Sequence, residues 1–366
     1  MGKISVGIVF GGKSAEHEVS LQSAKNIIDA IDREKYHVVL IGVDKKGSWQ
    51  INDETDFLLN AHDPKTIALK KSEAKIAVLP GEHQEQIFNY ETNQPLPQID
   101  VIFPIIHGTL GEDGSIQGLL RTLNLPFVGV DLLGSAVSMD KDFAKRILRD
   151  AGITVANGLV YKKHQQAEID FTFVQDKLGL PLFVKPVNQG SSVGVNRVET
   201  EAEFEHAIKE AFLYDDKVLI EEAIIGREIE CAILGNDDPI ASVPGEILPQ
   251  SGFYSYESKY IDESGAKLSA PAELTEEQMK KVQEEALRVF KTLDCEGMAR
   301  VDFFMKPDGT LIVNEVNTVP GFTKISMYPR LWGLSGLPYP KLIDRLIELA
   351  FERHERKQQL KSAVFN

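Results

Sequence analysis

The segment from Arg300 to Asn317, RVDFFMKPDGTLIVNEVN, constrains the fold most strongly because it has the pattern of a single β-hairpin. Apolar and polar residues alternate in its first half, a Pro-Asp-Gly turn follows, and a second apolar run completes the pattern. A loop with an even number of residues, centred on the Asp-Gly pair, would place Asp302 opposite Glu315 and Arg300 opposite Asn317. Because side chains alternate along a strand, all four would then lie on one face of the sheet.

Two carboxylates in directly opposed positions repel each other, since their Cβ atoms lie roughly 5 Å apart. The pair is understandable if a cation lies between them, and Asp, Glu and Asn oxygens are ligands that Mg²⁺ accepts. Asp302, Glu315 and Asn317 are therefore candidate metal ligands. Two alternatives stay open from the pattern alone. The face is a solvated acidic surface, or a three-residue loop with a bulge shifts the register by one and separates the pair.

Composition excludes several classes of protein. A chain of 366 residues is long for one core, which favours two or three domains. The formal charge of −15 argues against a nucleic-acid-binding surface, which requires a basic face. Cys231 and Cys295 lack metal-binding spacing, so we expect buried, reduced thiols. The apolar N-terminus reads as a core strand rather than a signal peptide, and no run approaches the ~20 residues of a membrane span. We therefore expect a cytoplasmic protein without membrane contact.

Strands alternate with helices over roughly residues 1 to 130, which is typical of a parallel α/β sheet. The apolar runs predict strands at 3–10, 36–44, 99–108 and 126–130. Residues 45–98 are more polar and less periodic. We predict three units for the chain, with the boundaries 1–138, 139–225 and 226–366.

The segment GIVFGGKS, which starts at Gly7, matches the expression of the phosphate-binding P-loop. Residues 8–10 look like the end of a core strand, which leaves too little loop to wrap a phosphate. A P-loop nucleotide hydrolase centred on Lys13 is therefore a minor alternative. The strand, Gly-Gly turn and helix place Glu16 and Glu18 near a helix N-terminus, where a carboxylate caps the helix or receives a substrate ammonium.

Three lysines are candidate phosphate ligands. Lys185 opens a Gly/Ser-rich turn between two predicted strands, and the backbone N–H groups of such a turn can fold over a phosphate. Lys141 and Lys145 lie one turn apart on a predicted helix. An exposed hairpin turn and a surface helix would show the same patterns. The segment 221–228 has carboxylates on either side of an apolar linker, which suits an adenine and ribose but equally any interdomain connector.

In this order, the motifs resemble those of the ATP-grasp enzymes, and within them the D-alanine–D-alanine ligases. The resemblance covers nearly the whole chain. It is carried by the segments FGGKSAEHEVSLQSA (10–24), HGTLGEDGSIQG (107–118), SMDK (138–141), KPVNQGSSVG (185–194), YSYESKY (254–260), ARVDFF (299–304) and NEVNTVPGFTKISM (314–327).

The resemblance implies an N-terminal parallel α/β domain followed by a two-part ATP-grasp fold, with 45–98 as the insertion of the longer family members. It implies ATP-dependent ligation of two D-alanine molecules through a D-alanyl phosphate, which supplies a peptidoglycan precursor. It further implies two Mg²⁺ ions, for which Mn²⁺ can substitute, a homodimer, and a lid at 249–270 that excludes water from the acyl phosphate.

Residue roles follow from the matching positions. The resemblance assigns catalysis to Glu16, Ser191, Tyr260, Arg300 and the backbone N–H of Gly321. It assigns the binding of the D-alanines to Val19, His107, Ser326 and the backbone of Met327. It assigns ATP binding to Lys141, Lys145, Lys185, Ser191, Ser192, Glu221, Glu222, Ile224, Glu228, Phe253, Lys259 and Asn314. It assigns metal binding to Asp302, Glu315 and Asn317.

Two alternatives concern the acceptor and the activity itself. Relatives that make D-alanyl-D-lactate carry His at the position of Tyr260, so Tyr favours an amine acceptor; D-lactate or another acceptor stays the alternative within the same fold. A non-enzymatic binding module, whose hairpin is only structural, is the alternative from a different class.

Overall fold

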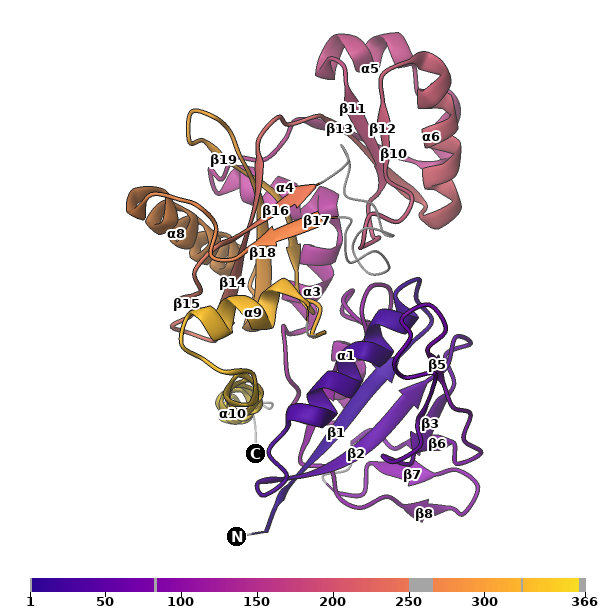
Figure 1. Cartoon of the computed structure of the whole chain (residues 1–366). Helices are drawn as coiled ribbons and strands as arrows, with labels where there is room; N and C mark the ends of the chain where they lie inside the picture. Colours follow the sequence, from indigo (N-terminus) through magenta and orange to yellow (C-terminus); the bar gives the residue numbers. More distant parts are fainter. Residues whose placement is uncertain (1, 82–83, 250–265, 324, 362–366) are drawn as a thin grey trace.

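The computed structural model of the chain describes residues 2–81, 84–249, 266–323 and 325–361. It contains three larger sheets, which succeed one another along the sequence from indigo through magenta to orange in Figure 1. Phe253, Lys259, Tyr260 and most of the predicted lid lie outside the described residues.

The N-terminal sheet has the strand order β3-β2-β1-β9. Its elements are β1 (Ile4–Gly11), α1 (His17–Ala30), β2 (Tyr36–Val43), β3 (Trp49–Asn52), β9 (Val101–Pro104) and α2 (Ser115–Thr122). Strand β1 pairs in parallel with β2 and with β9, which confirms the predicted parallel sheet. The P-loop alternative is wrong, because Gly7 and the residues up to Gly11 extend as a paired strand and form no loop.

The segment between β3 and β9 forms two small antiparallel sheets. They consist of β4 (Leu58–Leu59) with β5 (Ala68–Leu69), and of β6 (Ile76–Val78), β7 (Ile87–Asn89) and β8 (Gln94–Pro95). The strand predicted at 126–130 is wrong. Only one isolated parallel bridge, between Ile102 and Phe127, joins this segment to the sheet. The backbone turns at Gly129, whose φ is +97°, before a strand can form.

The central sheet is antiparallel, with the order β10-β13-β11-β12. Its elements are β10 (Gly158–Lys162), the 3₁₀ helix η1 (Lys163–Glu168), α5 (Phe171–Leu178), β11 (Leu182–Pro186), β12 (Asn196–Val198), α6 (Glu201–Tyr214) and β13 (Lys217–Glu222). Val184 and Ile220 point to one face and pack with Phe204 and Phe212 of α6. Because side chains alternate along a strand, Lys185 points to the opposite face of the sheet. Among the described residues, no helix of the central region covers that face.

The C-terminal sheet has the order β17-β16-β14-β18-β19, with β15 paired to β14. Its strands are β14 (Arg227–Gly235), β15 (Ile240–Ala241), β16 (Gly245–Pro249), β17 (Ala266–Ser269), β18 (Gly297–Met305) and β19 (Leu311–Asn317). The helices of this region are α3 (Leu132–Met139), α4 (Lys141–Asp150), α8 (Glu276–Thr292), α9 (Met327–Leu334) and α10 (Tyr339–Gln358). Ala144 and Leu148 of α4 pack with Val289 of α8, so α4 lies on the C-terminal core although it begins the predicted central range.

Strands β18 and β19 form the predicted hairpin, and its pairing at the polar end is confirmed. Arg300 lies opposite Asn317, and Asp302 lies opposite Glu315. The side chains of Arg300, Asp302 and Asn317 are hydrogen-bonded to one another, so they share one face.

The predicted even loop is wrong. Met305 pairs with Leu311, which leaves the odd-numbered loop 306–310 between the strands. Gly309 has a φ of +79° in this loop, a conformation that favours glycine. The odd loop shifts the register by one residue, and a β-bulge at Asn314 shifts it back before the polar end is reached. The correct pairing therefore arises from two compensating features that the pattern did not reveal.

Candidate active site

Three carboxylates lie in a row across adjacent strands of the C-terminal sheet. Glu230 of β14 lies opposite Asp302, and Glu315 lies opposite Asp302 from the other side. Glu230 is 7% exposed and Asp302 is 8% exposed. Like charges in such positions destabilise a sheet unless cations neutralise them. Glu230 was not predicted, although its two-residue spacing from Glu228 in an apolar strand was a signal for a shared face.

Arg300 supplies one neutralising charge to this row. Its Nε donates to Asp302 Oδ1 at 2.7 Å, and its Nη2 donates to Asp302 Oδ2 at 2.7 Å. The same Nε lies 3.2 Å from Glu230 Oε2. Asn317 Nδ2 adds a hydrogen bond of 2.9 Å to Asp302 Oδ2. The paired hydrogen bonds to Asp302 fix the orientation of the Arg300 guanidinium. A group that stabilises a developing anion requires such a fixed orientation.

Lys141 supplies a second charge and joins two parts of the chain. Its ammonium lies 3.3 Å from Glu315 Oε2 and donates to the Gln189 carbonyl at 2.6 Å. Lys141 is 8% exposed at the start of α4. It therefore connects the Gly/Ser-rich turn of the central sheet to the hairpin.

Glu16 approaches the same Gly/Ser-rich turn from the N-terminal domain. Ser191 Oγ donates a hydrogen bond to Glu16 Oε1. Gly108 and Gly190 leave room for this carboxylate, because a Cβ atom on them would lie 2.6 and 2.8 Å from Glu16 Oε2. Ser191 and Ser192 have φ values of +51° and +62°, which cost non-glycine residues of order 1–3 kcal/mol each. Such a cost is typical of a functional loop.

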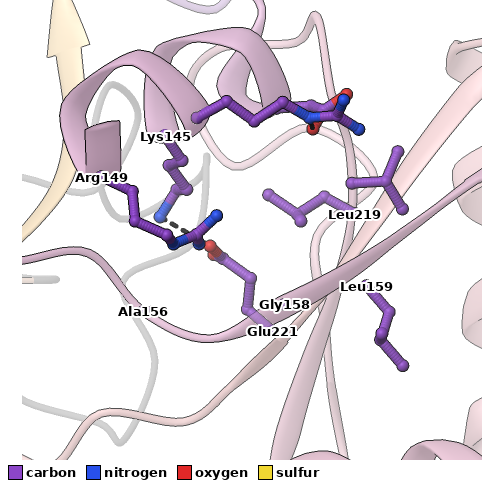
Figure 2. Close-up of a pocket in the computed structure, with 10 residues that line it drawn as sticks. Lys145, Arg149, Ala156, Gly158, Leu159, Leu219 and Glu221 are labelled. Atoms are coloured by element: carbon purple, nitrogen blue, oxygen red, sulfur yellow. Dashed lines mark hydrogen bonds and ion pairs between the residues drawn. The ribbon is translucent and has the colours of Figure 1, made fainter.

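The open face of the central sheet carries a buried group of three charges. Glu221 Oε1 lies 2.6 Å from the Lys145 ammonium (Figure 2). Glu221 Oε2 is paired with Lys185. Burial lowers the pKa of Lys145. Burial alone would raise the pKa of Glu221, but the two ammonium groups outweigh it and lower this pKa. Two cations and one carboxylate leave this face with net positive charge.

A cavity of about 310 Å³ lies beside this group of charges. Lys145 and Arg149 of α4 line one side, and Leu159, Leu219 and Glu221 of the sheet line another (Figure 2). The cavity combines apolar walls with polar groups, as small-molecule sites do.

His107 is fully committed to protein contacts. Nδ1 bonds the Val319 carbonyl at 2.8 Å, and Nε2 bonds Ser23 Oγ at 2.9 Å. Burial lowers the pKa of His107 to about 4, so the ring is neutral at pH 7. His107 is 3% exposed, and the structure therefore supports a role in holding Val319; contact with a substrate stays a prediction.

Glu112 is a buried carboxylate that the sequence patterns did not single out. Its Oε1 accepts a hydrogen bond from Gly108 N at 2.9 Å, and its Oε2 accepts one from Val319 N at 3.1 Å. Burial and the nearby Glu16 raise the pKa of Glu112 to about 7. Its position inside the HGTLGEDG motif was the only signal.

Gly321 and Ser326 lie close together in space, in the segment after the hairpin. A Cβ atom on Gly321 would lie 2.8 Å from Ser326 Oγ. Thr323 N donates to that hydroxyl at 3.0 Å, which fixes its position before helix α9. The Met327 side chain is buried in the core, and the contact of its backbone with a substrate stays a prediction.

The other predicted residues are dispersed around these groups. Val19 is buried within α1, and Asn314 forms the bulge. Glu222 Oε1 accepts hydrogen bonds from the backbone and side chain of Asn157 at 2.7 and 2.9 Å. Ile224 and Glu228 are half-buried around the connection between the sheets. Their roles stay predictions.

Cys231 and Cys295 are buried free thiols, as predicted. Burial raises the pKa of each to about 12. Within the described ranges, no helix combines the length and apolar character needed to cross a membrane.

The ATP-grasp enzymes combine an antiparallel sheet that carries buried lysines with a second antiparallel sheet that carries buried carboxylates. The charge of Glu315 acts on Lys145, so the two sets are close in space. The fold and the site therefore define an ATP-grasp ligase, with the N-terminal domain as a third contributor.

Comparison with known proteins narrows the class. The family model described as D-ala D-ala ligase N-terminus matches residues 5–130, and the model described as D-ala D-ala ligase C-terminus matches residues 147–348. A D-alanine–D-alanine ligase of Shouchella clausii (strain KSM-K16) is 62% identical over 366 residues, which cover 100% of both chains. The chain belongs to the D-alanine–D-alanine ligase family.

Solved structures agree with this assignment. The D-alanine–D-alanine ligase from Coxiella burnetii superposes with a TM-score of 0.84 at 41% identity, covering 98% of this chain and 97% of that one. The VanG D-Ala:D-Ser ligase from Enterococcus faecalis superposes with a TM-score of 0.83 at 36% identity, covering 95% of this chain and 100% of that one.

Proposed function

We propose that this chain uses ATP to join two D-alanine molecules into D-alanyl-D-alanine for peptidoglycan precursor synthesis. A continuous set of contacts across the three sheets carries the proposal. Glu16 of the N-terminal domain binds Ser191 of the central turn, and Lys141 joins that turn to Glu315 of the hairpin. Groups suited to an ammonium, a polyphosphate and a developing oxyanion therefore lie next to one another.

The nucleotide lies between the central and C-terminal sheets in this proposal. Lys141 and Lys185 contact the phosphates in this proposal, since Lys141 bonds the Gln189 carbonyl of the Gly/Ser-rich turn and Lys185 lies near the end of β11, directly before that turn. The base lies near Glu221, where the central sheet presents a cavity with apolar walls. Glu228, at the start of β14, contacts the ribose.

Mg²⁺ is the proposed metal, with two ions as in the resemblance. Asp302, Glu315 and Asn317 offer only oxygen ligands on one face, which matches a hard cation. Asn317 donates through Nδ2 to Asp302, so its Oδ1 is the atom offered to a metal. Among the residues that the structure describes, no group of three or more His, Cys, Asp and Glu side chains is arranged to hold a metal ion. When bound, Mg²⁺ or Mn²⁺ supplies positive charge to the ATP phosphates.

The reaction proceeds in two steps. A carboxylate oxygen of the first D-alanine attacks the γ-phosphorus of ATP, so that ADP leaves and a D-alanyl phosphate forms. The amine of the second D-alanine then attacks the acyl carbon, and inorganic phosphate leaves as the C–N bond forms. Glu16 holds the ammonium of the first D-alanine, while Arg300 and the Gly321 N–H stabilise the oxyanion of the tetrahedral intermediate.

A coupled phosphate-release assay tests this function. Purified protein with ATP, Mg²⁺ and D-alanine should release phosphate and form dipeptide in equal amounts. Absence of phosphate release with D-alanine, together with release for a different amino acid, would refute the substrate assignment. The Asp302→Asn variant tests the non-enzymatic alternative, because unchanged Mg²⁺-dependent nucleotide binding would support a merely structural hairpin.

The acceptor needs its own comparison, because one structural neighbour is a D-Ala:D-Ser ligase. Mixtures of D-alanine with D-serine or D-lactate should yield mainly D-alanyl-D-alanine. A hydroxy acid needs no amine deprotonation, so a D-lactate product would grow relative to dipeptide as the pH falls. A preference for D-serine or D-lactate at pH 7 would overturn the acceptor assignment.

We further propose a cytoplasmic homodimer formed through the N-terminal domain. Light scattering should then give twice the chain mass of 40.7 kDa. A mass of one chain at assay concentration would contradict the dimer and leave the ligase proposal untouched.

A further inference from the structure

The segment Thr318–Phe322 follows the hairpin directly and carries the Gly321 N–H that the proposed reaction uses. Side chains of the N-terminal domain hold this segment by hydrogen bonds at both of its ends. The bonds join residues that are up to 299 positions apart in the sequence. They therefore depend on how the N-terminal domain meets the C-terminal sheet.

Glu112 holds the first end of the segment. Its Oε2 accepts hydrogen bonds from Val319 N at 3.1 Å and from Thr318 Oγ1 at 3.4 Å. Its Oε1 accepts one from Gly108 N at 2.9 Å. All three partners are donors, so the side chain must accept through both oxygens. A carboxylate does this, whereas an amide of the same shape has only one acceptor oxygen.

His107 connects Val319 at the first end to Ser23, and Ser23 holds the other end at Phe322. The Val319 carbonyl can only accept, so His107 Nδ1 carries the proton of their 2.8 Å bond and Nε2 is an acceptor. Ser23 Oγ donates to that Nε2 at 2.9 Å, and in turn accepts from Phe322 N at 3.3 Å. Ser23 is fully buried, and Phe322 is too. The donor and the acceptor in each of these three hydrogen bonds are therefore determined.

Gly321 lies between the two held ends. Among the described residues, the Gly321 N–H donates to no protein acceptor, whereas the N–H groups of Val319 and Phe322 do. One uncommitted amide between two fixed ones is the arrangement that an oxyanion donor requires, because the donor must be in place before charge develops.

We propose that Glu112, and Ser23 acting through His107, are positioning residues that hold the Gly321 N–H against the hairpin and couple the N-terminal domain to the reacting centre. The proposal rests on the proposed ligase function. Neither Glu112 nor Ser23 is expected to touch the reacting atoms.

The Glu112→Gln variant tests the first end, with Asp113→Asn as its matched control. Asp113 lies in the same loop and also accepts two backbone hydrogen bonds, from Leu110 N and Ser115 N, but it does not contact the segment. Glu112→Gln should lower kcat by about 10- to 100-fold, the cost of a small displacement of a catalytic donor, with the KM for ATP unchanged. Asp113→Asn should keep kcat within about threefold, as surface changes usually do.

The Ser23→Ala variant tests the other end without altering any charge near Glu16. Its matched control is Ser20→Ala, since Ser20 lies on the same helix, is fully buried and makes two hydrogen bonds of its own, to Gly11 N and Ile105 O. Both variants should lower the Tm, because each removes two buried hydrogen bonds. Only Ser23→Ala should also lower kcat, by about 10-fold, the effect of losing the bond that holds Phe322 N.

The outcomes separate the two proposals. If the native chain forms no dipeptide, the proposed function fails. If it forms dipeptide but each variant matches its control in kcat, the positioning role is wrong and the function stands. The double variant should lose less kcat than the two single losses combined, because both act on one segment. If Glu112→Gln does not fold, the serine pair decides.

Discussion

Replacing Glu221 by Gln should destabilise the central sheet, because it leaves two buried ammonium groups without their shared carboxylate. Glu221 is 3% exposed and Lys145 is 5% exposed, and their charged atoms lie 2.6 Å apart. Removing one partner of a buried ion pair costs about 3–5 kcal/mol. That cost is a large fraction of the 5–15 kcal/mol that stabilises a typical domain.

Hydrogen exchange of the β13 amides is the appropriate measurement, since several domains do not share one unfolding transition. A loss of about 3–5 kcal/mol corresponds to exchange that is faster by two to four orders of magnitude, at 1.4 kcal/mol per factor of ten. Glu222→Gln is the matched control. Glu222 is the next residue of the same strand, and Gln keeps the Oε1 that accepts from Asn157.

The pH dependence of this variant has a defined sign. Burial lowers the pKa of Lys145, and the neighbouring Lys185 lowers it further once Glu221 is absent. In the window below the ordinary value of 10.5, the unfolded chain then binds more protons than the folded chain, so stability rises with pH. The defect should therefore shrink as the pH is raised from 7 to 10. A defect below about 1 kcal/mol at pH 7, equal to that of Glu222→Gln, would refute the reasoning, since that is the worth of an exposed pair.

Three further predictions concern single side chains. Gly321→Ala should raise the KM for the second D-alanine about 10-fold or more, because the new Cβ atom would lie 2.8 Å from Ser326 Oγ and displace the hydroxyl that we propose binds the carboxylate of this substrate; an unchanged KM would exclude Ser326 from that site. His107→Gln should lose less stability than the native chain between pH 7 and 5. The pKa of His107 is about 4 in the folded chain and 6.5 in the unfolded chain, so protonation of the unfolded chain removes up to about 3 kcal/mol of the native chain's stability as the pH falls. Parallel Tm–pH curves for the two proteins would contradict this. Lys185→Ala should abolish phosphate release while Lys13→Ala leaves it intact, and the reverse result would revive a P-loop enzyme.

The hairpin shows how far the sequence could predict the site. Alternation along the strands correctly placed Arg300 and Asp302 on one face. The loop length was wrong, because nothing in the local pattern distinguishes a two-residue turn from an odd loop followed by a bulge. The bulge at Asn314 compensates for that loop and brings Glu315 opposite Asp302. The pairing at the polar end was therefore predicted correctly for an incomplete reason, and the metal and oxyanion roles of its residues stay predictions.

Residues whose role depends on distant contacts could not be predicted from the pattern. Glu112 meets Val319 across 207 positions of the sequence, and Glu230 meets Asp302 only through the pairing of β14 with β18. Sequence periodicity describes one element at a time, so it cannot show which elements become neighbours. The motif resemblance assigned roles to Glu16 and Ser191, but it assigned none to Glu112.

The charges of the central and C-terminal sheets explain why the proposed nucleotide site needs both sheets. The hairpin side has three carboxylates in a row, with Arg300 as the cation of its own sheet, so it would repel a polyphosphate. The central side has Lys145 and Lys185 around the single carboxylate of Glu221, so it attracts one. A nucleotide anion between them is drawn toward the lysines and requires added cations before it can approach the hairpin. The placement of the carboxylates opposite the lysines therefore supports the proposed role of a divalent metal, and Lys141, which contacts Glu315 and the Gln189 carbonyl, connects the two sides.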